Sequence, residues 1–216
     1  MFGIFRRTPA AAPAAPGPIR LHVGCGQEAI AGWVNIDNQP LPGVDRVLDV
    51  RGGLPFSGVA AIYAEHFIEH LAFEDGLAFL AECRRVLAPD GVLRLSTPNL
   101  DWVLTTHYRW QDVTPPDRVV DCMKLNRAFH AWGHQFLYNQ ETLTAAFRSA
   151  GFAHVRFHRY GESEREELRG LERHERWGDR EELLHVLVAE AWGTAAREPI
   201  APAELLKDFR ETMAAR

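Results

Sequence analysis

The chain has 216 residues, a formal net charge of −5 at pH 7 and a hydrophobic share of 46%. This length suffices for one domain with a real core, and the acidic balance argues against a nucleic-acid partner, which favours a basic face. No segment reaches the apolar length of a membrane span, and the three cysteines lack the spacing of a disulfide framework or a zinc cluster. We therefore expect a cytoplasmic protein with no nucleic-acid partner and no integral membrane segment. The sequence does not predict its oligomeric state.

The first 18 residues are predicted to form a disordered tail. Residues 8–18 are mostly proline and alanine, a composition that cannot pack a core. The apolar part of residues 1–7 is too short for a secretory signal. We therefore assign one folded domain to residues 19–216.

A strand that runs into a Gly-x-Gly turn opens this domain. Residues 19–23 are followed by Gly24-Cys25-Gly26, and glycines at a strand exit let a ligand approach the backbone closely. A dinucleotide site would need a full helix after the turn and an acid about 20 residues further on. Here only residues 27–31 remain for a helix, and Asp37 already follows at the end of the second apolar run.

Strands and helices alternate from residue 19 onward, which indicates a mostly parallel sheet. The predicted strands in this part are residues 19–23, 33–37, 45–50, 60–64 and 91–97. The clearest predicted helix, residues 73–88, has one apolar face, acids in its first turn and arginines in its last. A second helix is expected over residues 140–150, with Asn139 as its N-cap and Gly151 as its stop.

The last part of the chain is expected to complete the sheet. Residues 153–158 alternate between apolar and polar side chains, and residues 183–191 form a more buried strand. Between them, the charged residues 161–182 are predicted to be a solvated loop or short helix. Residues 202–215 suggest a terminal amphipathic helix.

An ordered set of motifs resembles one enzyme family. After the glycine turn and Asp37 come Leu54-Pro55-Phe56, then Ile62-Tyr63-Ala64-Glu65-His66-Phe67-Ile68-Glu69-His70-Leu71, then Glu82-Cys83-Arg84-Arg85-Val86-Leu87-Ala88-Pro89-Asp90-Gly91. Over roughly residues 19–160 this order resembles the class I S-adenosylmethionine-dependent methyltransferases, particularly the small type 11-like group. Two departures are the missing third glycine of the turn and the very short first helix.

The resemblance implies both a fold and a cofactor. The fold is α/β: a Rossmann-like, mixed seven-stranded sheet, mostly parallel with an antiparallel last strand, and helices on both faces. The cofactor is S-adenosyl-L-methionine. Gly24, Cys25 and Gly26 would then pass their backbone beneath its ribose and methionine parts.

Four more residues receive cofactor roles. Asp37 has the geometry to accept hydrogen bonds from both ribose hydroxyls, with an ordinary turn acid as the alternative. The family places adenine contacts at the end of the third strand, which points to Asp49 and Val50, although Asp49 equally fits turn chemistry. Glu65 closes the fourth strand, where the family's sulfonium lies.

Three histidines are candidates for general-base catalysis, because a histidine near neutrality can take a proton from a hydroxyl or amine acceptor. His66 follows the fourth strand, His70 lies four residues later, and His134 precedes the helix at 140–150. For His70, a helix-entry residue bonded to the backbone is the competing interpretation. His130 and His134 repeat the four-residue spacing, which admits a metal. We expect no metal, because no acidic residue is positioned in the sequence to complete a site.

Residues 99–138 form an aromatic insertion after the fifth strand. Its aromatic and histidine side chains are Trp102, His107, Tyr108, Trp110, Phe129, His130, Trp132, His134, Phe136 and Tyr138. So many aromatics outside the sheet pattern suggest a lid over an apolar or sugar-like acceptor. A satellite core that buries the insertion itself is the alternative.

Three functions are therefore considered. The leading one is a methyltransferase that acts on a small-molecule or glycan acceptor, by O- or N-methylation. A nicotinamide oxidoreductase is disfavoured by the truncated first helix and the early Asp37. A degenerate cofactor-fold protein that serves as a binding or scaffold subunit stays open, since the sequence holds no signature catalytic motif.

Overall fold

The computed structural model describes residues 17–174 and 183–214. The predicted tail therefore lies almost entirely outside the described residues, as does the 175–182 part of the predicted charged loop.

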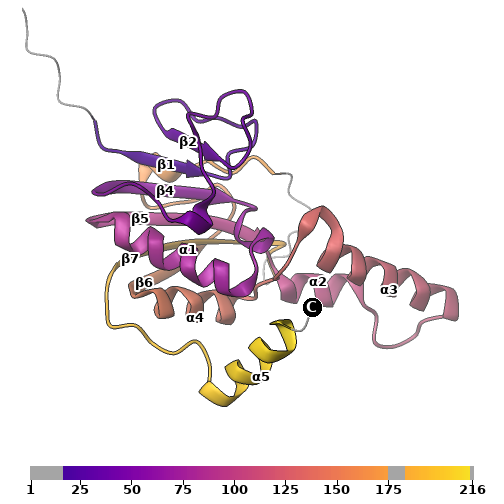
Figure 1. The fold of residues 1–216 in the computed structure, drawn as a ribbon. Coiled ribbons are helices and arrows are strands. Elements are labelled where there is room, and N and C mark those ends of the chain that lie inside the picture. The colour runs from indigo at the N-terminus through magenta and orange to yellow at the C-terminus, as the bar shows by residue number, and fades with distance from the viewer. Residues whose placement is uncertain (1–16, 175–182, 215–216) are drawn as a thin grey trace, which may run out of the picture.

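Seven strands form one sheet in the order β3-β2-β1-β4-β5-β7-β6 (Figure 1). Their bounds are β1 Arg20–Val23, β2 Val34–Asp37, β3 Arg46–Val47, β4 Val59–Glu65, β5 Leu87–Pro98, β6 Phe152–His158 and β7 Val186–Thr194. Strands β1 to β5 pair in parallel, and β7 runs antiparallel to both of its neighbours, β5 and β6. The predicted mixed, mostly parallel sheet with an antiparallel last strand is confirmed.

The register brings three strand ends to one level. Val23 of β1 lies opposite Ile36 of β2 on one side and opposite Ala64 of β4 on the other. The residues that follow these three positions therefore meet at one edge of the sheet, where open α/β sheets bind ligands.

Helices cover one face of the sheet. Helix α1, Phe73–Val86, and helix α4, Gln140–Ala150, pack their apolar stripes onto β1, β4 and β5 in one continuous core (Figure 1). The Asn139 side chain accepts a hydrogen bond from the Thr142 N–H, and Gly151 adopts a left-handed conformation that ends α4, both as predicted. Helix α5, Ala203–Ala214, lies outside them and pairs Arg210 with Glu74 of α1.

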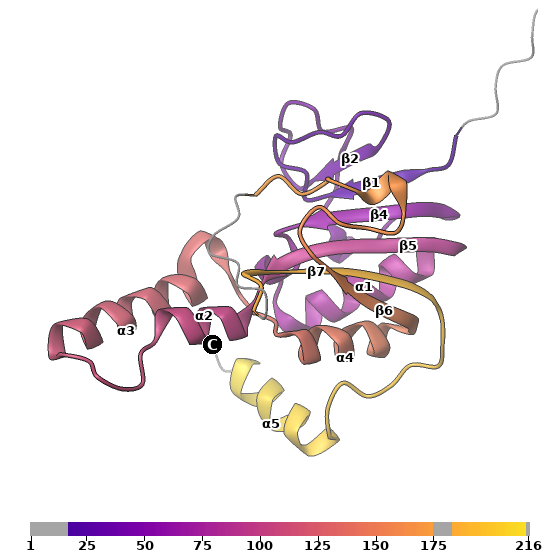
Figure 2. The same cartoon turned by 180° about the vertical axis from the view of Figure 1, so that it is seen from behind.

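The opposite face is covered by an extended segment, residues 159–174, rather than by α-helices (Figure 2). Its one helical turn, η4 Glu166–Leu168, and Leu171 pack onto Ala61 and Tyr63 of β4. The α-helices thus cover one face and the short 3-10 helix η4 lies on the other, where α-helices were expected as well. Of the two alternatives predicted for residues 161–182, the short helix is present at η4, although Leu168 is buried rather than solvated. Residues 24–33, between β1 and β2, form turns instead of a crossover helix, so the later segment covers the exposed strands.

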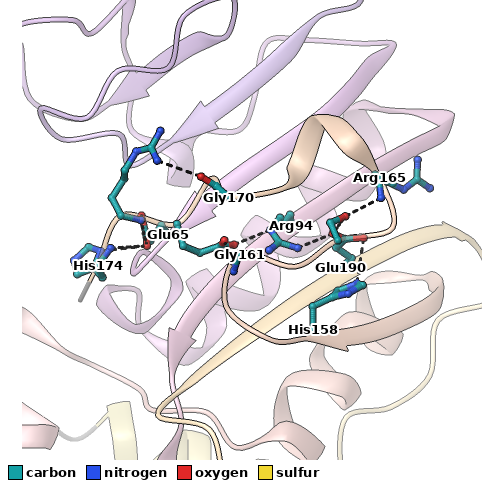
Figure 3. Close-up of polar contacts among 11 residues, drawn as sticks. Glu65, Arg94, His158, Gly161, Arg165, Gly170, His174 and Glu190 are labelled. Atoms are coloured by element: carbon teal, nitrogen blue, oxygen red, sulfur yellow. Dashed lines mark hydrogen bonds and ion pairs between the residues drawn. The ribbon is translucent and has the colours of Figure 1, made fainter. Parts of the chain in front are cut away.

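A buried ion network holds this segment in place (Figure 3). Arg94 of β5 is completely buried and pairs with Glu172 of the segment at 2.7 Å and with Glu190 of β7 at 2.6 Å. The Ser163 hydroxyl donates a further hydrogen bond to Glu190 at 2.7 Å. Two carboxylates thus compensate one buried guanidinium, and the segment is joined to two central strands.

The third strand is shorter than predicted. Residues 45–50 contribute only the two residues of β3, and the chain then enters a one-turn helix, η1 Val50–Gly52. The Asp49 side chain caps this turn by accepting a hydrogen bond from the Arg51 N–H. Asp49 and Val50 therefore do not end a strand, because the capping interaction bends the chain first.

The aromatic insertion forms a helical hairpin that projects from the sheet beyond the end of β5 (Figures 1 and 2). It consists of α2 Leu100–His107, α3 Pro115–His130 and the turn η3 Ala131–Gly133. Thr114 and Asp117 form a capping box at the start of α3. None of the described helices is both long and apolar enough to cross a membrane.

Candidate active site

The glycine turn after β1 is shaped by its neighbours. Gly24 has a φ of +67°, and a Cβ there would lie 2.4 Å from the Phe67 ring, so only glycine fits without strain. The Cys25 N–H donates to the Ile36 carbonyl at 3.1 Å, and the Gly26 N–H donates to Asp37 at 2.9 Å. These two amides therefore bond to residues of β2 and are not free for a ligand.

Asp37 ends β2 with its carboxylate held in one orientation. Its Oδ2 accepts from the Gly26 N–H and its Oδ1 from the Gln39 N–H, each at 2.9 Å. A carboxylate offers about four acceptor positions, so each oxygen keeps one for a ligand. The side chain lines a first cavity of about 420 Å³.

The first cavity gathers most of the predicted cofactor residues. It is lined by Gly24, Asp37, Asp49, Val50 and His66, with apolar contributions from Ile36, Leu48 and Leu71. Cys25 is buried beside it, and this burial raises the pKa of its thiol. The glycine turn and the loop after β3 thus line one cavity, as the resemblance to the methyltransferases implies.

Asp49 has a partner of its own. The Arg51 side chain contacts both of its oxygens, with the shortest distance 2.6 Å, and lowers the pKa of Asp49 to about 2. The carboxylate is therefore ionised and already paired. An adenine contact from Asp49 stays a prediction that this pairing does not favour.

Glu65 holds a loop rather than lining either cavity (Figure 3). Its carboxylate accepts from the Arg173 N–H at 2.8 Å and lies 3.4 Å from Nδ1 of His174. Burial alone would raise the pKa of Glu65, but the His174 side chain and the two backbone amides outweigh it and lower that pKa. In this structure, Glu65 fixes the end of the 159–174 segment.

A second cavity, of about 820 Å³, adjoins the first, and both are lined by His66 and His70. Six of the ten histidines of the chain line it: His66, His70, His107, His134, His174 and His185. All three predicted catalytic histidines are therefore brought to one space.

His66 lies where the two cavities adjoin, and its backbone conformation is unusual. Its φ is +45°, a conformation that a non-glycine residue adopts only under constraint. Its Nδ1 lies 3.1 Å from Oε1 of the buried Glu69, and its ring stacks on His174 with centroids 4.0 Å apart. A carboxylate beside Nδ1 favours the tautomer that leaves a lone pair on Nε2, and in the described part of the chain the buried Nε2 has no hydrogen-bond partner.

His70 and His134 face each other, with ring centroids 5.2 Å apart. The Nδ1 of His134 lies 2.8 Å from the Ala128 carbonyl oxygen, which can only accept, so Nδ1 carries the proton. The Gln135 side chain donates to the His70 carbonyl at 2.7 Å. This contact joins the insertion to the segment after β4.

The aromatic side chains of the insertion lie in different surroundings. Trp102 and Trp132 line the second cavity, whereas Tyr138 is completely buried in the main core and Phe136 packs against it. Trp110 is 77% exposed and belongs neither to the lining of the second cavity nor to the main core. The lid function itself stays a prediction.

Three cavity or junction residues escaped the sequence analysis. Glu69, His174 and His185 received no role, although Glu69 lies between His66 and His70 in a quoted motif. The sequence signal for Glu69 was a carboxylate beside apolar residues, because a carboxylate is costly to bury without a partner. His174 and His185 come from segments that only the tertiary structure brings to the cavity. His107, named with the insertion, lines the second cavity.

Comparison of the sequence with protein families and with curated proteins finds no match. Solved structures do match. A possible exported protein from Bordetella parapertussis has a TM-score of 0.52 at 16% identity, over 82% of this chain and 63% of its own length. The chain thus spans less than two thirds of that protein.

Two methyltransferase structures match over more of their length. In the complex of the Haloferax volcanii Trm112 methyltransferase activator with a methyltransferase, the TM-score is 0.51 at 14% identity, over 86% of both chains. A SAM-dependent methyltransferase from Archaeoglobus fulgidus has a TM-score of 0.50 at 16% identity, over 82% of this chain and 86% of its own. Together with the strand order, these likenesses show that the chain has the class I methyltransferase fold.

Proposed function

We propose that the chain is an S-adenosyl-L-methionine-dependent methyltransferase that methylates a hydroxyl or amine of a small-molecule or glycan acceptor. The observation that carries the proposal is the pair of adjoining cavities at the carboxyl edge of the sheet. One contains the oriented Asp37 carboxylate, the other contains the histidines, and His66 and His70 border both.

The first cavity fits the chemistry of the cofactor. Asp37 keeps one acceptor position on each oxygen, which suits two neighbouring ribose hydroxyls. Val50, Leu48 and Ile36 supply apolar walls for a purine ring. Gly26 has open space where a Cβ would project, so the turn leaves room for a ligand. When bound, S-adenosyl-L-methionine would supply the electrophilic methyl group.

The residues of the second cavity would hold the acceptor and move its proton. Trp102 and Trp132 offer aromatic faces to an apolar or sugar-like acceptor. His66 would take the acceptor proton at Nε2, with Glu69 beside Nδ1 stabilising the resulting imidazolium. Holding donor and acceptor in line within a closed site would supply the remaining rate enhancement.

The absence of a crossover helix speaks against a nicotinamide cofactor. A dinucleotide pyrophosphate is held at the N-terminus of the helix that follows the first strand. Residues 24–33 form turns here, so this part of the chain offers no such N-terminus.

Calorimetric titration of the full chain with S-adenosylhomocysteine and with NAD tests the proposal. We expect micromolar binding of the first and none of the second. Binding of NAD alone would overturn the proposal in favour of an oxidoreductase, and binding of neither would overturn it in favour of a scaffold protein.

A further inference from the structure

Glu69, His70 and His134 each bring one ligand atom to a common point, and these atoms lie within 4.8 Å of one another. Ligand atoms bound to one ion at about 2.0–2.2 Å lie roughly 3–4 Å apart, so small side-chain rotations would close the set. We propose that these three residues bind a divalent transition-metal ion at the junction of the two cavities.

The buried carboxylate is the first argument. Glu69 is completely buried, and its Oε2 accepts a hydrogen bond from the Thr97 hydroxyl at 3.0 Å. Within residues 17–174 and 183–214 its Oε1 has no hydrogen-bond partner, and Nδ1 of His66, 3.1 Å away, pairs with it only when His66 is protonated. A buried carboxylate oxygen without a partner is costly, and a cation beside it would remove that cost.

The state of His134 is the second argument. The Ala128 carbonyl holds the proton on Nδ1, so the neutral ring presents a lone pair at Nε2. Metal-binding histidines are commonly oriented in this way, with the second nitrogen donating to a backbone carbonyl. His134 therefore has both the tautomer and the outer contact of a ligand.

The third argument is that the backbone already holds the ligands together. The N–H groups of Gln135 and Phe136 both donate to the Glu69 carbonyl, at 2.7 and 3.2 Å. The Gln135 side chain donates to the carbonyl of His70, 65 residues away in the chain. The segment that carries His134 is thus fixed directly on the two residues that carry the other ligands.

The donor set indicates the kind of ion. Two imidazoles and one carboxylate suit Mn²⁺, Co²⁺ or Zn²⁺, whereas Mg²⁺ and Ca²⁺ prefer oxygen donors. Three protein ligands leave positions open, as in catalytic rather than structural sites.

His70 and His134 line the second cavity, so an ion held between them would lie at the wall of that cavity. Resting on the proposed function, we infer that the ion binds an acceptor oxygen there. His70 and His134 then act as ligands, and His66 alone serves as the general base.

The test is a calorimetric titration of the chelator-dialysed full chain with CoCl₂, MnCl₂ and ZnCl₂, with MgCl₂ for comparison. Visible absorption of bound Co²⁺ gives a second readout, independent of activity. We expect one transition-metal ion per chain and an affinity at least about tenfold lower in His70→Ala, His134→Ala and Glu69→Gln. The matched control is His107→Ala, which removes another histidine of the same cavity outside the cluster and should keep the affinity within about twofold.

Circular dichroism of each variant checks folding, and His70→Ala and His134→Ala suffice if Glu69→Gln does not fold. No saturable binding to the wild-type chain, or equal affinity in these two histidine variants, would overturn the proposal. S-adenosylhomocysteine is titrated into the same samples. Cofactor binding without ion binding overturns the metal site alone, and ion binding without cofactor binding overturns the proposed function alone.

Discussion

Asp37 is the residue on which the cofactor assignment depends most. Its two backbone hydrogen bonds fix the carboxylate at the edge of the first cavity before any ligand arrives. A preorganised acceptor of this kind loses little entropy on binding, so its hydrogen bonds contribute fully to affinity.

We expect Asp37→Ala to weaken S-adenosylhomocysteine binding by roughly 1.5–3 kcal/mol, the range for hydrogen bonds to a charged group. Calorimetry measures the change. The control is Asp90→Ala, which removes an exposed acid at the opposite end of the sheet and should leave affinity unchanged. Equal affinity in wild type and a folded Asp37→Ala would remove the ribose assignment.

His66 is the first candidate for the general base because it borders both cavities and its buried Nε2 has no hydrogen-bond partner among the described residues. We expect His66→Ala to lower turnover by about 10²–10⁴-fold while leaving cofactor affinity nearly intact. His130→Ala, an exposed histidine outside both cavities, should keep wild-type turnover. If His66→Ala, His70→Ala and His134→Ala all stay within a few-fold of wild type, positioning alone carries the reaction.

At the scale of elements, helix α1 clamps the loop that precedes β4. Glu82 accepts from the Leu54 N–H at 3.1 Å, and Arg85 contacts both Glu82 and the Leu54 carbonyl, each at 2.7 Å. The Arg85 side chain and the Leu54 amide lower the pKa of Glu82 from 4.5 to about 2. The loop thus gains a stabilising contact that depends on ionised Glu82.

The sign of the pH dependence follows from this lowered pKa. The contribution of Glu82 is fully present above pH 4.5 and is lost as pH falls from 4.5 toward 2. We expect Glu82→Gln to lower the free energy of unfolding at pH 7 by about 1 kcal/mol, since water screens this partly exposed pair. Chemical denaturation at pH 7 and near pH 2 measures it. A difference of the same size at both pH values would contradict the assignment.

The α2–α3 hairpin is the element expected to move. It projects from the sheet (Figure 2), and only part of it, around Trp102 and Trp132, lines the second cavity. We expect slower hydrogen exchange in residues 99–138 when cofactor and acceptor bind together, because a closed lid opens less often. Helix α4, which is packed in the core, serves as the internal control. Equal exchange in free and doubly bound protein would favour a satellite core.

At the scale of the whole molecule, the Arg94 network joins the second face of the sheet to the second cavity. It fixes the 159–174 segment through Glu172 (Figure 3), and His174 at the end of that segment stacks on His66. The same segment therefore covers the sheet and completes the wall of the second cavity.

We expect Arg94→Ala to lower the free energy of unfolding by about 3–5 kcal/mol, because two buried carboxylates lose their cation. The matched control is Arg156→Ala on β6, whose pair with Glu164 is exposed and should contribute about 0–1 kcal/mol. Urea denaturation compares the two. Similar small losses in both variants would show that Glu172 and Glu190 find other partners.

The sequence by itself determined the order of the strands in the chain, helices α1 and α4, and the position of Asp37 at a strand end. These features follow from periodicity, caps and stops within a few residues, which local physics decides. The predicted strand at 45–50 failed for a local reason as well, since capping by Asp49 competed with strand extension.

Only the tertiary structure decided which distant residues meet. Glu69 and His70 come from the segment after β4, His134 from the insertion and His174 from the segment over the second face. Glu69 lies beside His70 in the sequence, but only the fold brings His134, from more than 60 residues away, to this pair. Such neighbours depend on strand order, on register and on what covers each face, and no short stretch of sequence contains that information.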